Sequence, residues 1–111
     1  REHYFIAPPG ELIYETDIKI PWKGFFMFIT QGLNREIKTY LDGELINDYD
    51  GSFYVPAVHR SRTGTEKEVQ RGWHRIRLEV AGESESEIFF DVGVAKNWDL
   101  LKNMEWRLIN E

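Results

Sequence analysis

Apolar and polar residues alternate strictly along the stretch from residue 71 to residue 80. One set of alternating positions is mostly apolar, and its members are His74, Ile76, Leu78 and Val80. The other set is polar or amphipathic, and its members are Trp73, Arg75, Arg77 and Glu79. A period of two predicts a strand with one side in a core and the other side outside it. We therefore predict a central strand over 73–80 that presents a tryptophan and two arginines on its outer side.

The same period recurs along the chain, and glycine and proline turns separate the segments. We expect strands over residues 3–7, 11–20, 25–30, 35–42, 44–46, 53–58, 73–80, 88–95 and 104–109, with a short strand at 67–71 leading into Gly72. The apolar run 25–30 is typical of a central strand covered on both sides. Asp42-Gly43 predicts a type I′ hairpin turn, and Pro56 favours an edge strand or a bulge.

No segment has the period of an amphipathic helix. Short strands at regular spacing predict an antiparallel all-β sandwich of about eight or nine strands, and a jelly roll is the favoured version. The length of 111 residues fits a single domain spanning residues 1–111. Because the sequence opens on Arg1 and not on methionine, we expect a domain cut from a longer protein.

Composition narrows the chemistry. The absence of cysteine excludes disulfides, zinc–thiolate sites and a thiol nucleophile. The net charge of −5 argues against a nucleic-acid partner, and no apolar run reaches membrane-spanning length. The range 59–77 nevertheless holds six basic side chains against two acidic ones. These basic groups could hold an anion, or they could pair with surrounding acids, and the sequence favours neither.

The sequence offers little that predicts catalysis. His3, His59 and His74 are widely separated, and they form no metal-binding or nucleophile motif. His74 shares its strand face with apolar residues, so we expect a core histidine with a satisfied hydrogen bond. Nineteen acidic residues make chance carboxylate pairs easy, so no glycosidase pair can be assigned. We therefore expect that the protein is not an enzyme and that it has no catalytic residue.

Three segments resemble galactose-binding-like β-sandwich domains. Their sequences are YLDGELI at 40–46, VQRGWHRIRLEV at 69–80 and SEIFFDVGV at 86–94. Such domains share a D/N-G hairpin, a G-x-H-x-I strand and a following hydrophobic strand in this order. The resemblance implies a sandwich fold and the context of a carbohydrate-binding module attached to a secreted glycoside hydrolase. It carries over no ligand-binding residue, because the matched positions lie in turns and core.

Aromatic and arginine side chains supply the best functional signal, since aromatic rings stack on sugars while polar groups bind the hydroxyls. Two sites compete. The first is the strand face with Trp73, Arg75, Arg77, Tyr40 and Lys38. The second is a loop site with Tyr49, Tyr54, His59, Arg60, Arg62 and Trp98. Arginines can grip carboxylates with two parallel bonds, so a uronic-acid polymer is the sharper prediction. The strand face could not bind a ligand if a second sheet of the protein covered it.

A calcium site is a weaker prediction. Asn47, Asp48 and Asp50 supply oxygen ligands before Gly51, as hard-cation loops do. A plain turn explains the same residues and is the favoured interpretation, so we expect no cofactor other than this structural calcium.

We therefore expect a non-catalytic carbohydrate-binding module, outside the cell or on its surface, that holds an adjacent catalytic domain near a polysaccharide. The alternative is a structural or protein-docking sandwich domain of a multidomain secreted enzyme. Neither hypothesis involves nucleic acid or a membrane.

Overall fold

The computed structural model describes residues 3–52, 64–94, 100–101 and 104–110. These residues form nine strands: β1 (Tyr4–Ala7), β2 (Leu12–Ile20), β3 (Gly24–Gly32), β4 (Glu36–Leu41), β5 (Glu44–Tyr49), β6 (Gly64–Val69), β7 (Gly72–Ala81), β8 (Ser86–Gly93) and β9 (Arg107–Leu108). All strand pairs are antiparallel. In the residues described, no helix has the length and apolar character needed to cross a bilayer.

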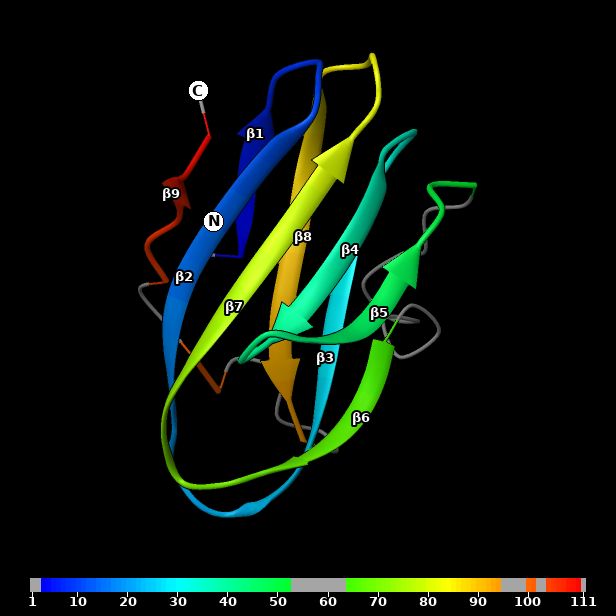
Figure 1. Cartoon of the computed structure of the whole chain (residues 1–111). Coiled ribbons are helices and arrows are strands. Elements are labelled where there is room, and N and C mark those ends of the chain that lie inside the picture. The colour runs from blue at the N-terminus through cyan, green and yellow to red at the C-terminus, as the bar shows by residue number, and fades with distance from the viewer. Residues whose placement is uncertain (1–2, 53–63, 95–99, 102–103, 111) are drawn as a thin grey trace.

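The strands form two facing sheets, which confirms the predicted sandwich (Figure 1). One sheet has the order β1-β8-β3-β6, and the other has the order β5-β4-β7-β2-β9. The first eight strands thus follow the order of a jelly roll, in which the chain crosses repeatedly between the sheets. The strand predicted to be central, β7, lies between β4 and β2 in the five-stranded sheet.

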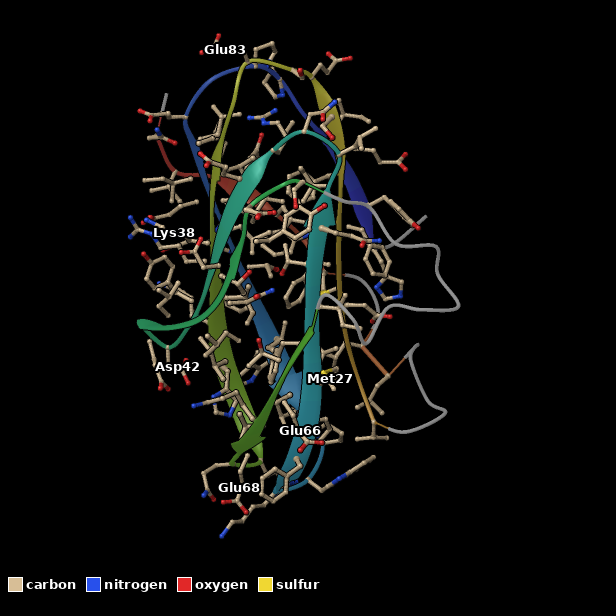
Figure 2. The ribbon with its side chains drawn as sticks, turned by 90° about the vertical axis from the view of Figure 1, so that its right-hand side faces the viewer. Met27, Lys38, Asp42, Glu66, Glu68 and Glu83 are labelled. Carbon is tan, nitrogen blue, oxygen red and sulfur yellow. The ribbon has the colours of Figure 1, made fainter. Side chains whose placement is uncertain are left out.

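The core lies between the sheets, where the alternating positions predicted it. On β7, Ile76 and Leu78 are fully buried, and Trp73 on the opposite side is exposed. The four-stranded sheet contributes Phe26, Phe28 and Phe90 to the same core. Side chains on the outer side of each sheet point away from this core, and Figure 2 shows the two sheets edge-on with Lys38 on the outer side of the five-stranded sheet.

Strand limits differ from the sequence prediction where a partner strand extends the ladder. β3 continues to Gly32 because Gln31 and Gly32 pair with β8, and β5 continues to Tyr49, which pairs with Ile37. β9 has only two residues, and Leu108 is exposed instead of facing the core. The expected strand 53–58 lies outside the described residues. The apolar run of β3 is central, but Phe25 at its start is 60% exposed, so only the later part is covered on both sides.

The predicted hairpin turn between β4 and β5 is confirmed. Asp42 has a φ of 49° and Gly43 has a φ of 87°, the positive values that a type I′ turn requires. The backbone N–H of Asp42 also donates a hydrogen bond of 2.9 Å to the carbonyl oxygen of Arg75. The turn is therefore fixed to the middle strand of the sheet.

One end of the sandwich is organised by Arg35, which has 0% exposure although it follows an exposed turn. Its guanidinium donates five hydrogen bonds, and every acceptor is a main-chain carbonyl oxygen. The acceptors belong to Ala7, Pro8, Gly10, Ala81 and Ser84, at 2.6–3.2 Å. Arg35 thus joins the β1–β2 connection to the β7–β8 connection. We call this set of contacts the Arg35 clamp.

Candidate functional site

The outer face of the five-stranded sheet, hereafter the outer face, brings together the residues predicted for the strand-face site. Its side chains are Lys38 and Tyr40 of β4, Trp73, Arg75, Arg77 and Glu79 of β7, and Ile13, Glu15, Asp17 and Lys19 of β2. Strand register places Tyr40, Arg77 and Glu15 in one row across the sheet. Trp73 is 69% exposed and the arginine side chains are also accessible. The described residues therefore leave this face open.

Trp73 lies at one end of the outer face, opposite Lys19 of β2. The Lys19 ammonium lies 5.9 Å from the centroid of the indole ring, within the range of a cation–π contact. This contact restrains an indole that otherwise projects into solvent. A restrained, exposed aromatic ring on a sheet is suited to stacking against a flat apolar ligand surface.

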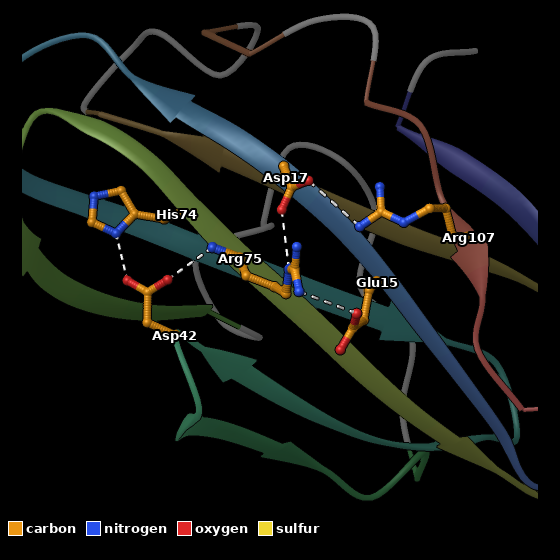
Figure 3. A network of polar contacts seen from close by, with 6 residues as sticks. All are labelled: Glu15, Asp17, Asp42, His74, Arg75 and Arg107. Carbon is orange, nitrogen blue, oxygen red and sulfur yellow. Dashed lines mark hydrogen bonds and ion pairs between the residues drawn. The ribbon is translucent and has the colours of Figure 1, made fainter.

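Carboxylates neutralise Arg75 and Arg77 of the outer face, and Figure 3 shows the contacts of Arg75 with Asp17 and Glu15. Arg75 contacts Asp17 at 3.1 Å and Glu15 at 3.8 Å, and the bond to Asp17 raises the pKa of Arg75. Arg77 contacts Glu79 at 3.0 Å. The sequence left open whether the basic residues bind an anion or pair with neighbouring acids. In the structure, Arg75 and Arg77 pair with acids.

A hollow of about 620 Å³ continues the outer face beyond Glu79, away from Trp73. Four carboxylates and one ammonium group line it together with apolar and amide groups. The charged members are Glu11, Glu36, Asp48, Glu79 and Lys38. Tyr40 donates a hydrogen bond of 3.3 Å to Glu79. Because Tyr40 pairs with Arg77 across the strands, this bond connects the hollow to the rest of the outer face. From Trp73 to Glu79 the strand spans about 20 Å.

His74 and Asp42 connect the hairpin turn to β7 (Figure 3). Nδ1 of His74 lies 2.6 Å from the Asp42 carboxylate, and Nε2 lies 2.7 Å from the carbonyl oxygen of Gln70. Both neighbours are acceptors, so a ring protonated on both nitrogens satisfies them together. Burial lowers the pKa of His74, but these two hydrogen bonds and the Asp42 charge outweigh it and raise the pKa overall. The expected hydrogen bond of His74 is confirmed, but His74 is half-buried and does not belong to the core.

The calcium candidates do not form one loop. Asn47 and Asp48 are consecutive residues of β5, so their side chains point to opposite sides of the sheet. The carboxylate of Asp50 accepts a hydrogen bond of 2.9 Å from the backbone N–H of Ser52, as in a plain turn. Among the residues that the structure describes, no group of three His, Cys, Asp or Glu side chains could hold a metal ion. Calcium stays an untested prediction.

The loop site is only partly described. Tyr49 was expected to be available to a ligand, but it is 5% exposed and belongs to the hydrophobic core. It is buried because β5 extends to Tyr49 and pairs it with the core residue Ile37. Five of the proposed loop residues lie outside the described residues, namely Tyr54, His59, Arg60, Arg62 and Trp98.

Sequence reasoning missed the hollow, although part of its signal was present. Ile13 faces outward on β2, Glu11 directly precedes that strand with the same period, and Glu36 faces outward on β4, so extending the face by one row would have found them. Asn110 gave no signal, because its place depends on how the chain after β9 returns to β2.

Comparisons of the chain with protein-family models, with curated proteins and with solved structures give no match. The assignment below therefore depends on the geometry of the outer face.

Proposed function

We propose that the outer face binds a carbohydrate chain and that the domain is a non-catalytic carbohydrate-binding module. The observation that supports this most directly is the position of Trp73, a 69% exposed indole in line with paired polar side chains and a hollow. The resemblance of residues 40–46 and 69–94 to galactose-binding-like domains supports the same class. It also supports the proposal that the domain belongs to a secreted enzyme.

The chemistry of the outer face suits a sugar. The indole of Trp73 can stack on the apolar face of a pyranose ring, while carboxylates and guanidiniums bind hydroxyl groups. The ion pair of Arg77 with Glu79 and that of Arg75 with Asp17 hold these long side chains in place before binding. Less side-chain freedom is then lost when the ligand binds. In a parent enzyme, such binding would raise the local concentration of polysaccharide.

Trp73→Ala tests the proposal. Removing the stacking surface should weaken retardation on polysaccharide affinity gels by about tenfold, since losing about 60 Å² of buried apolar area costs roughly 1.5 kcal/mol. Trp22→Ala is the matched control. Trp22 is a second exposed tryptophan, with 46% exposure, but it lies in the turn between β2 and β3. Equal losses in both variants, or no retardation of the unmodified domain on any glycan, would contradict the proposal.

The alternative is a docking domain, and exposed apolar residues on the four-stranded sheet favour it. Ile6 is 57% exposed and Phe25 is 60% exposed, and neither lies on the outer face. Under this alternative, Phe25→Ser would weaken association with a neighbouring catalytic domain, while Trp73→Ala would not. Pull-down of the separately expressed domains distinguishes the two functions.

A further inference from the structure

We infer that the outer face selects uncharged sugar chains and rejects uronic-acid polymers. This inference depends on the proposed carbohydrate function and specifies its ligand. It replaces the sequence-based prediction of a uronate ligand, which assumed that Arg75 and Arg77 could bind carboxylates of the ligand. That prediction requires guanidiniums that are free to bind an incoming anion.

The arginines already have carboxylate partners within the sheet. Arg77 directs both Nε and a terminal nitrogen at one oxygen of Glu79, Oε2, at 3.1 and 3.0 Å. The other oxygen, Oε1, accepts the hydrogen bond from Tyr40. Arg75 is shared between Asp17 and Glu15. A uronate carboxylate that approached either arginine would find the positive charge already balanced and a protein carboxylate beside it.

The hollow opposes a uronate more directly. Its charged lining comprises the carboxylates of Glu11, Glu36, Asp48 and Glu79 and the ammonium of Lys38. Because Arg77 balances Glu79, three carboxylates remain against one ammonium. A carboxylate on a sugar in this hollow would face an excess of negative charge. At a separation of about 8 Å in water, each unbalanced like-charge pair weakens binding by roughly twofold. Hydroxyl groups meet no such penalty, because ionised carboxylates accept hydrogen bonds from them.

Matched polymers provide the test. Soluble hydroxyethylcellulose is compared with β-1,4-linked polyglucuronate, and β-1,4-linked mannan with polymannuronate, by affinity electrophoresis of the unmodified domain at low salt. We expect retardation by at least one neutral polymer, and we expect its uronate counterpart to bind about fivefold more weakly, as two unbalanced negative charges predict. Binding to the neutral polymer should change less than twofold between 20 and 500 mM salt, since screening acts on charges.

A pair of double variants tests the cause of the selectivity. Glu36→Gln with Asp48→Asn removes two negative charges from the hollow, so the ratio of uronate to neutral affinity should rise severalfold. Glu66→Gln with Glu68→Gln removes the same charge from β6, in the other sheet (Figure 2), and should leave that ratio within twofold. Circular dichroism of both variants checks that they fold.

The outcomes separate the two proposals. If a uronate polymer binds more tightly than its neutral counterpart, carbohydrate binding stands and the selectivity is wrong. An unchanged ratio in the hollow variant would also overturn the selectivity. If no polymer of either kind binds, the proposed function itself fails, and the selectivity fails with it.

Discussion

Arg35 carries more hydrogen bonds than any other side chain in the part of the chain that the structure describes. Its five bonds satisfy carbonyl oxygens at a buried end of the sandwich. Arg35→Met keeps the apolar stem but leaves these oxygens without donors, so we expect a loss of roughly 3–5 kcal/mol in the free energy of unfolding. Urea denaturation measures this loss. Arg71→Met, at an exposed position, should change stability by less than about 0.5 kcal/mol, and an equally small loss at Arg35 would contradict the clamp.

His74 gives the fold a pH dependence of known sign. Because its pKa is raised in the folded state, its stabilising contribution is complete below the unfolded pKa of about 6.5 and is lost as pH rises through the folded value. Denaturation midpoints should therefore fall as pH increases from about 6.5, and this slope should disappear in His74→Gln. An NMR titration of the His74 ring gives the folded pKa directly, and a value at or below 6.5 would refute the bridge.

Asp42 contributes in the opposite direction. Partial burial would raise its pKa, but the hydrogen bonds from the Arg75 N–H and from His74 outweigh burial and lower it. Its contribution is thus present above the unfolded pKa of about 4 and is lost as pH falls through the folded value. The bridge between Asp42 and His74 is most favourable between these two limits.

At the scale of elements, two glycines with similar backbone angles have different surroundings. Gly43 has a φ of 87°, and a Cβ there would meet nothing within 4 Å. Gly51 has a φ of 79°, and a Cβ there would lie 2.5 Å from the carbonyl oxygen of Arg35. Gly43→Ala should cost about 1–2 kcal/mol from backbone strain alone. Gly51→Ala should cost roughly 1–3 kcal/mol more, because the backbone of Arg35 must move. Equal thermal shifts in the two variants would contradict this comparison.

The elements also show what the sequence could predict. Alternation along β2 and β7 was enough to assign the buried and outer sides of both strands, since a strand has only two sides. The Asp42-Gly43 turn followed from the φ values that these residues tolerate. The ends of β3, β5 and β6 were not predictable in this way, because they depend on how far the neighbouring strands continue. The burial of Arg35 depends on two connections about 25 to 49 residues away in sequence, which no local pattern contains.

Part of the candidate site could also be predicted from the sequence. Trp73, Arg75 and Arg77 were placed together on an open face by period alone. The ion pairs of Arg75 with Asp17 and Glu15 required the register between strands, which sequence periodicity does not supply. Arg77 and Glu79, in contrast, lie two residues apart on the same side of β7. The acidic hollow required both the register and the position of the chain after β9.

At the scale of the whole molecule, the strand order determines how the chain must fold. β1 pairs with β8 and β2 pairs with β7, so most of the sheet forms only after distant segments meet. Proteins dominated by such non-local pairs fold in milliseconds to seconds. We expect refolding from urea in this range, followed by stopped-flow tryptophan fluorescence at 25 °C. Completion within microseconds would show that local structure dominates the folding barrier.

The Arg35 clamp has a consequence for engineering. Since the guanidinium binds only main-chain oxygens, the side chains of Pro8 and Ser84 take no part in its hydrogen bonds. New amino acids can therefore be introduced into these connections without removing a donor or an acceptor, provided that Gly10 and Gly82 keep their positive φ values. The end of the sandwich at the Arg35 clamp is thus a place to graft foreign binding loops, provided that Glu11 and Ala81, which line the hollow, keep their positions.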